Sequence, residues 1–182
     1  MEPSFHGLKA LRAQRQWSLD KASQRTGVSK AMLGQIERGE SSPTLNTLWK
    51  IAQGFELSFS QLMAIVMPGQ DGGERQPFAP HASGLVVKTL IPYDADMKAE
   101  LLELRLSPGC LRESAPHEQG VREYIILLSG VVSILADGQW HPLVVGQVFE
   151  FMADQPHAYQ NKASDAEAVF HNLIYYPQGR IN

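Results

Sequence analysis

The sequence has few of the features that anchor, export or cross-link a protein. Its one cysteine, Cys110, excludes an internal disulfide and a zinc cluster built from several thiolates. No apolar run reaches the roughly 20 residues that a membrane-spanning helix needs. The first residues lack the basic and apolar regions of a secretory signal. We therefore expect a cytoplasmic protein with no membrane partner, in which Cys110 is a small, partly buried side chain.

An excess of basic charge is also absent, because the formal net charge is −3. The charge is, however, unevenly distributed along the chain. Residues 1–67 carry eight Lys and Arg against five Asp and Glu, a net charge of +3, and the remainder carries eight against fourteen, a net charge of −6. This asymmetry favours a nucleic-acid-binding half joined to a half that does not contact phosphate.

The spacing of apolar residues changes once along the chain, which predicts two domains of different class. Up to residue 66 the spacing is helical and predicts five short helices, over residues 6–15, 18–26, 29–38, 44–53 and 58–66. The last of these begins with a capping box, Ser58-Phe59-Ser60-Gln61. From residue 84 the pattern is of short β-rich runs separated by turn pairs, at residues 85–91, 99–106, 124–128, 131–135, 147–151 and 169–175.

We therefore predict a multi-domain protein, α followed by all-β. The helical domain spans residues 1–66 and the β domain, an antiparallel sandwich or barrel, spans residues 84–182. The intervening residues 67–83 are rich in glycine and proline, which is typical of a linker.

Residues 17–39 have the pattern of two helices around a tight turn. Gly27 permits a positive φ at the end of the first helix, and Ser29 can cap the second. Val28, Leu33 and Ile36 point inward, which leaves an outer face near the start of the second helix. In a helix-turn-helix that end enters the major groove of DNA, where glutamine pairs with adenine and lysine with guanine or phosphate. The outer-face residues are Ser29, Lys30, Ala31, Gly34 and Gln35.

The same segment resembles the phage-repressor-like, or XRE, helix-turn-helix family across residues 6–66. The resemblance is carried by Gly27-Val28-Ser29-Lys30, Ile36-Glu37-Arg38-Gly39 and Ser42-Pro43-Thr44-Leu45. It implies a lambda-repressor-like five-helix domain, a pair between Arg12 and Glu37, and an approach of residues 39–44 to the DNA backbone. We expect a homodimer on a pseudo-palindromic double-stranded operator, since one such domain binds weakly. The predicted DNA-binding residues are Ser18, Ser29, Lys30, Ala31, Gly34, Gln35, Arg38 and Thr44.

In the second half, residues 109–130 and 157–161 together resemble the two motifs of the cupin family, a jelly-roll β-barrel. The resemblance covers residues 84–177. Strand alternation is expected to point positions 117 and 119 into the barrel together. The predicted pocket, for a small-molecule effector or a metal, consists of His117, Gln119, Glu123, His157 and His171.

No cofactor is certain from these residues, and a divalent metal is a possible one. Metal-binding cupins typically carry a second histidine where this chain has Gln119, and an amide is a poor ligand for iron, nickel or zinc. His117, Glu123 and His157 nevertheless form two histidines and one carboxylate, the set used by non-haem iron oxygenases. The sequence thus leaves open an effector pocket and a metal site.

Our leading hypothesis is a transcriptional regulator, not an enzyme, whose DNA affinity changes when a metabolite occupies the cupin domain. The combination resembles the cupin-sensor branch of XRE regulators, including regulators of sulfur-source utilisation, and implies target genes of that kind. The alternative is an iron oxygenase or epoxidase that carries a helix-turn-helix, like the phosphonate epoxidases. A third hypothesis, a toxin-neutralising protein, gives the β domain no role.

Overall fold

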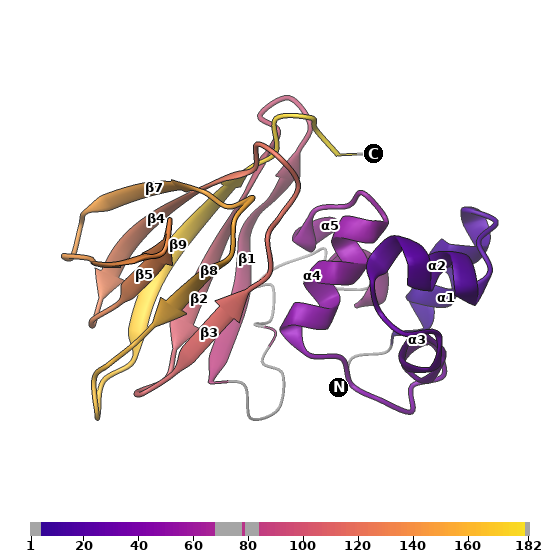
Figure 1. The fold of residues 1–182 in the computed structure, drawn as a ribbon, viewed down its shortest axis with the longest axis horizontal. Helices are drawn as coiled ribbons and strands as arrows, with labels where there is room; N and C mark the ends of the chain where they lie inside the picture. Colours follow the sequence, from indigo (N-terminus) through magenta and orange to yellow (C-terminus); the bar gives the residue numbers. More distant parts are fainter. Residues whose placement is uncertain (1–4, 68–77, 79–83, 181–182) are drawn as a thin grey trace. The chain divides into compact units, whose positions relative to one another are not determined.

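The computed structural model describes residues 5–67, 78 and 84–180, without the side chain of His6 (Figure 1). The chain divides into two compact units, with the boundary between residues 75 and 76. Most of the predicted linker, residues 67–83, lies outside the described residues. Phe78 falls within that range, yet it is buried and forms a β-bridge with Val87, so this residue is part of the second unit.

The first unit contains five helices in its described part, and each bound lies within one residue of its prediction. They are α1 (His6–Gln14), α2 (Leu19–Thr26), α3 (Lys30–Glu37), α4 (Leu45–Gly54) and α5 (Phe59–Val66). Ser18, Ser29, Thr44 and Ser58 cap the last four, because each side chain accepts a hydrogen bond from the backbone three residues on. None of the described helices is long and apolar enough to cross a membrane.

The core of the first unit is aliphatic and aromatic. Glycine permits close approaches of α1 to α5, at Gly7, and of α2 to α4, at Gly54. A Cβ on Gly54 would lie 2.6 Å from the Cα of Thr26, nearer than a real Cβ approaches any atom, so the two helices meet there backbone to backbone. The largest fully buried side chains are Leu8, Leu33, Ile36, Leu48, Ile51, Phe55, Phe59 and Leu62.

The second unit is a two-layered antiparallel arrangement of a five-stranded and a four-stranded sheet (Figure 1). The first sheet has the order β1-β2-β9-β4-β7 and the second the order β3-β8-β5-β6. The strands are β1 (Leu85–Asp94), β2 (Ala99–Leu106), β3 (Leu111–Ser114), β4 (Arg122–Ser129), β5 (Ser133–Ala136), β6 (Gln139–Pro142), β7 (Val148–Met152), β8 (His157–Gln160) and β9 (Ala168–Tyr175). The six predicted runs correspond to strands, whereas β3, β6 and β8 were not predicted.

A row of directly paired residues crosses the five-stranded sheet and positions two buried acids. Glu100 on β2 pairs with Ile174 on β9, Ile174 with Glu123 on β4, and Glu123 with Phe151 on β7. Directly paired residues share a face of a sheet, and all four are buried. Glu100 and Glu123 therefore lie on the inner face of the sheet, one strand apart.

Candidate functional site

The first candidate site is the exposed face of α3 in the helical unit. Gly27 has a φ of 67° at the end of α2, and its N–H donates to the carbonyl of Ser23, so the chain turns sharply into α3. Val28, Leu33 and Ile36 are buried beneath α3. The opposite face presents Ser29, Lys30, Ala31 and Gln35, all of them exposed as predicted.

Gly34 departs from its prediction. It was expected on the outer face of α3, but it is buried. A Cβ at this position would lie 3.1 Å from Nη1 of Arg38 and 3.8 Å from a methyl carbon of Leu19, so these side chains cover it. Gly34 leaves room for the Arg38 side chain to lie across the helix.

The predicted pair between Arg12 and Glu37 is present and fixes α3 against α1. Arg12 donates through Nε to Oε1 of Glu37 at 2.6 Å and through Nη2 to Oε2 at 2.8 Å. Its Nη1 also donates to the backbone carbonyl of Trp17 at 2.8 Å. The hydrogen bonds to Glu37 raise the pKa of Arg12 above its ordinary value. Arg12 thus joins α1, the start of the α2 segment and the end of α3.

The other predicted DNA-binding residues lie at exposed helix ends. Ser18 caps α2 and Thr44 caps α4, and a helix N-terminus presents backbone N–H groups that suit a phosphate. Lys30 pairs with Asp20 at 2.8 Å, and Arg38 pairs with Glu40 at 2.7 Å. Both pairs are exposed and therefore weak, so a DNA phosphate could replace Asp20 or Glu40 as the partner of the cationic side chain.

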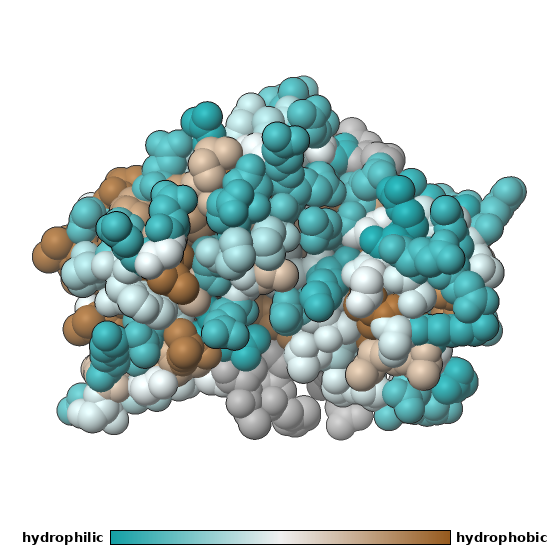
Figure 2. Space-filling model, in the orientation of Figure 1, coloured by the Kyte–Doolittle hydropathy of each residue, from teal (hydrophilic) through white to brown (hydrophobic). Residues whose placement is uncertain are grey.

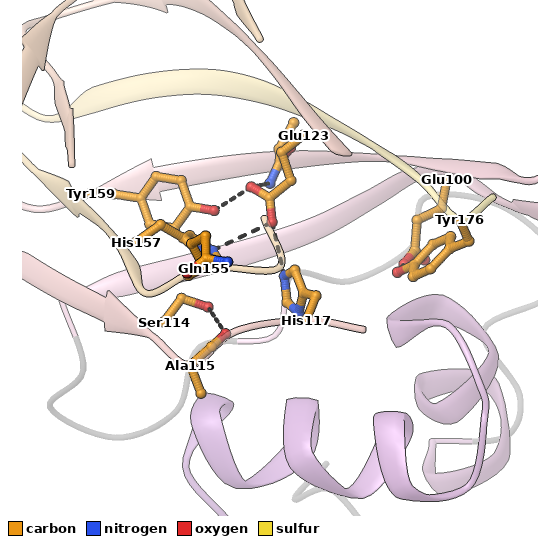
Figure 3. Close-up of polar contacts among 10 residues, drawn as sticks. Glu100, Ser114, Ala115, His117, Glu123, Gln155, His157, Tyr159 and Tyr176 are labelled. Atoms are coloured by element: carbon orange, nitrogen blue, oxygen red, sulfur yellow. Dashed lines mark hydrogen bonds and ion pairs between the residues drawn. The ribbon is translucent and has the colours of Figure 1, made fainter. Parts of the chain in front are cut away.

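The second candidate site is centred on Glu123, which is 1 % exposed (Figure 3). Its Oε1 lies 2.9 Å from Nε2 of His117 and 3.5 Å from Nε2 of His157. Its Oε2 accepts hydrogen bonds from the Tyr159 hydroxyl and, at 2.8 Å, from Nδ2 of Asn172. Strands β4, β8 and β9, together with the segment after β3, therefore place their polar side chains around one carboxylate.

The electrostatics of this cluster favour an ionised carboxylate. Burial alone would raise the pKa of Glu123, but the hydrogen bond with His117 and the charge of His157 outweigh it and hold the pKa far below its ordinary value. For His157, burial alone would lower the pKa, whereas Glu123 raises it above the ordinary value. Burial and the nearby Glu123 both raise the pKa of Tyr159, so its hydroxyl stays protonated. Tyr159 is therefore a hydrogen-bond donor in this site.

The two units match two known families. The helix-turn-helix family matches residues 8–62, and the cupin domain family matches residues 102–174. The HTH-type transcriptional regulator SutR of Escherichia coli (strain K12) is 42% identical over 171 residues, which cover 94% of this chain and 93% of that protein. The chain belongs to the helix-turn-helix transcriptional regulators that carry a cupin domain.

Solved structures of such regulators agree with the fold of this one. A crystal structure of an HTH_3 family transcriptional regulator from Vibrio cholerae has a TM-score of 0.81 and 47% identity, covering 94% of this chain and 93% of that chain. The cupin domain of an XRE family transcriptional regulator from Enterobacter cloacae has 42% identity and a TM-score of 0.50, covering 52% of this chain and 98% of that one. The predicted fold class is thus confirmed in both halves.

Two predicted pocket residues of this cupin regulator lie elsewhere. The expectation that His117 and Gln119 point into the barrel together from one strand is wrong, because both lie between β3 and β4. His117 reaches Glu123 from this segment, whereas Gln119 is exposed in a turn. His171 was expected to line the pocket but lies on the outer face of β9, with Nε2 3.9 Å from the Glu103 carboxylate. The alternating burial along β9 shows that Phe170, Asn172 and Ile174 face inward instead.

Sequence reasoning missed two members of the site. Tyr159 is not among the predicted pocket residues, yet it is buried and its hydroxyl contacts Glu123. Asn172 was not singled out, although it occupies the inward position between two buried apolar residues of β9. A polar residue at an inward position of a strand requires a polar partner, and this signal identifies Asn172.

A divalent metal fits this site. The donor atoms of His117, Glu123 and His157 all lie within 4.8 Å of one another. Nε2 of His157 is buried without a hydrogen-bond partner, while its Nδ1 contacts the carbonyl of Gln155 at 2.9 Å and fixes the ring orientation. These three side chains would hold the ion, which when bound supplies a Lewis acid for an oxygen of a ligand.

Proposed function

We propose that this regulator reads a specific operator with the exposed face of α3. The observation that supports this is the combination of a rigidly held helix and an exposed polar edge. Arg12 and Glu37 fix the helix through two hydrogen bonds, while Gln35 projects from it with its amide accessible. An exposed glutamine on such a helix can form two hydrogen bonds to adenine in the major groove.

The phosphate contacts of the proposed complex flank this edge. The capped ends of α2 and α4, at Ser18 and Thr44, offer backbone N–H groups, and Lys30 and Arg38 offer cationic side chains. These contacts orient the domain on the duplex without reading sequence, so base identity depends on Gln35 together with the small side chains of Ser29 and Ala31.

Selection of bound fragments from random or genomic DNA with the purified full-length protein tests the proposal. We expect one enriched sequence with two related half-sites. Gln35→Ala should lose the preference for particular bases at one position of each half-site, with a cost of about 1–3 kcal/mol. Gln14→Ala, which changes an exposed glutamine on α1, is the matched control and should leave selection unaltered. Absence of any enriched sequence would contradict the proposal.

The protein is further proposed to act as a homodimer through the β unit. Exposed apolar side chains gather on β6 and β7, at the end of β4 and in the segments that flank β5 and β6, at the left end of the second unit in Figure 2. Such a concentration of exposed apolar side chains at one end of a unit is unusual on a monomer. A second copy is the occupant that an operator with two half-sites requires. The residues are Leu128, Val131, Trp140, Val144, Val145 and Val148, with Val144 70% exposed.

The cupin unit is proposed to sense a small-molecule effector, and the protein to act in the cytoplasm without catalysing a reaction. The cluster around Glu123 supplies a buried carboxylate, together with Nε2 of His157 and Oδ1 of Asn172, neither of which has a hydrogen-bond partner. Genes for the use of sulfur sources are the proposed targets, on the strength of the resemblance described above. The genes beside the selected operators test this assignment.

A second candidate function is favoured by one observation, the convergence of His117, Glu123 and His157. This set can hold Fe(II) with open positions for substrate and oxygen, as in a non-haem iron oxygenase or epoxidase. Elemental analysis of purified protein tests the first requirement of the oxygenase, which is stoichiometric iron, and absence of iron would contradict this second function. Iron-dependent turnover of an organic substrate would favour the enzyme.

A further inference from the structure

Arg112 differs from the other arginines of the structure. No carboxylate or carbonyl partner contacts its guanidinium among residues 5–67, 78 and 84–180, and its Nε is buried without a hydrogen bond. A buried donor without a partner costs free energy, so such an arrangement calls for a function. The remaining described arginines each have a partner: Arg12 with Glu37, Arg15 with the Phe55 carbonyl, Arg25 with Glu56, Arg38 with Glu40, Arg105 with Glu103, Arg122 with Glu150 and Arg180 with Glu118.

The register of β3 shows where the Arg112 side chain points. Arg112 pairs directly with Tyr159 on β8, and Ser114 pairs with His157. Directly paired residues of antiparallel strands project from the same face. Tyr159 reaches Glu123 on the opposite sheet, so this face is the interior (Figure 3). Burial along β3 agrees, because Arg112 and Ser114 are half-buried and their neighbours Leu111 and Glu113 are exposed.

The interior acids are already engaged and do not neutralise this guanidinium. Glu123 contacts His117, Tyr159 and Asn172, and Glu100 accepts a hydrogen bond from Tyr176. Arg112 therefore brings an uncompensated positive charge to the inner face of the four-stranded sheet, which also carries Tyr159 and His157. A guanidinium offers two parallel N–H donors, which match the two oxygens of a carboxylate, sulfonate, sulfate or phosphate.

We propose that Arg112 binds an oxyanion group of the effector. The remainder of the effector would extend towards the cluster around Glu123, where Nε2 of His157 and Oδ1 of Asn172 have no hydrogen-bond partner. This inference rests on the proposed sensing role of the cupin unit and narrows it, because it excludes neutral metabolites and cations as effectors.

Thermal unfolding of the purified full-length protein tests the inference. The probes are inorganic sulfate, inorganic phosphate and acetate, with acetamide as the neutral counterpart of acetate and sodium chloride to match ionic strength. We expect at least one oxyanion to raise the Tm of the wild type while acetamide does not. The response to the three anions distinguishes a tetrahedral oxyanion from a carboxylate. Failure of all three anions to stabilise the wild type would overturn the inference.

Two variants assign the effect to Arg112. Arg112→Gln should lower the affinity for the stabilising anion about tenfold or more. Arg112→Lys keeps the charge but loses the paired donors, so its affinity should fall between those of the wild type and Arg112→Gln. Arg105→Gln, at an exposed arginine paired with Glu103, is the matched control and should respond like the wild type. An Arg112→Gln variant that responds like the wild type would also overturn the inference.

The stability of the variants without an anion is a second readout. In chloride buffer Arg112→Gln should have a Tm no lower than that of the wild type, because the arginine lacks an internal partner. A large drop in Tm, or failure to fold, would show that Arg112 is structural and would contradict the inference.

Operator binding separates this inference from the proposed function. Arg112→Gln should still bind the selected operator, since α3 lies in the other unit. Operator binding without any anion response would contradict the Arg112 inference alone. An anion response without operator binding would contradict the regulatory function and leave the anion site in place.

Discussion

Arg12 and Glu37 form the one ion pair in the described part of the helical unit in which both side chains are shielded from solvent. Their exposed fractions are 16% and 6%, against 43% and 45% for Arg25 and Glu56. Because solvent screens an exposed pair strongly and a shielded pair much less, only the first is expected to contribute to stability. It links the helix that begins the unit to the helix proposed to read DNA.

Glu37→Gln should therefore lower the free energy of unfolding of the helical unit by about 1–3 kcal/mol, since it leaves a shielded guanidinium without its counter-charge. The measurement is urea unfolding followed by the helical circular dichroism signal. Glu56→Gln makes the same chemical change at the exposed pair and should cost less than about 0.5 kcal/mol. Equal effects of the two substitutions would show that shielding does not decide the value of the pair.

Gly54→Ala should destabilise the helical unit by about 1–3 kcal/mol, because the added methyl group meets the backbone of α2. The new carbon would lie 2.6 Å from Cα of Thr26 and 2.8 Å from the carbonyl oxygen of Arg25. Gly34→Ala is the control within the same unit, since there the closest atom belongs to the movable end of Arg38. It should be neutral or slightly stabilising, and a cost similar to that of Gly54→Ala would contradict the packing described for α3.

Lys30→Ala should weaken DNA binding and make that binding less dependent on the salt concentration. If Lys30 leaves Asp20 for a phosphate, the slope of log K against log salt concentration should fall in magnitude by about one for each Lys30 in the complex. Fluorescence anisotropy with the selected operator at several salt concentrations gives this slope. Lys9→Ala, at an exposed lysine of α1, should leave the slope unchanged. A slope that does not change in Lys30→Ala would exclude this contact.

Val145→Asp should convert the dimer into a monomer at micromolar concentration, as measured by analytical ultracentrifugation. Val145 is 61% exposed within the proposed dimer surface, and a buried unpaired carboxylate there would cost several kcal/mol. Ile91→Asp introduces the same charge at a residue of β1 that is 43% exposed, and should leave the dimer intact. Retention of the dimer in Val145→Asp would place the interface elsewhere.

Metal binding should depend on the three converging side chains and not on His171. After incubation with Fe(II), Zn(II) or Ni(II) and removal of free ion, His117→Ala should retain at least about tenfold less metal than the wild type. His171→Ala should retain the wild-type amount, since His171 lies near Glu103 on the outer face of β9. Metal retention that is equal in the wild type and His117→Ala would exclude the proposed ligand set.

The helices could be predicted closely because their signals are local. Ser18, Ser29, Thr44 and Ser58 each bond to a backbone group only three residues away, so the sequence around each cap determines where its helix begins. All strands of the four-stranded sheet have four residues, and only β5, which lies in the apolar run 131–135, was predicted, whereas β3, β6 and β8 were missed. Such strands are defined by pairing with distant residues rather than by their own sequence.

The candidate pocket was predicted in part for the same reason. His117, Glu123 and His157 followed from the resemblance to cupins, and the structure brings them together. The positions of His171 and Asn172 depend on which face of β9 turns inward, and a shift of one residue exchanges the two faces. The partner of Tyr159 depends on the distance across two sheets, which local spacing does not encode.

The position of β3 at the edge of its sheet bears on how effector binding could be transmitted to the rest of the protein. Among the described strands it is hydrogen-bonded to β8 alone, whereas β9 at the centre of the other sheet is bonded along both sides. Less free energy is needed to displace a strand held by one ladder than a strand held by two. A compound bound to Arg112 would thus act directly on a strand that is held by a single ladder, so that binding and release could shift this strand at low cost in free energy.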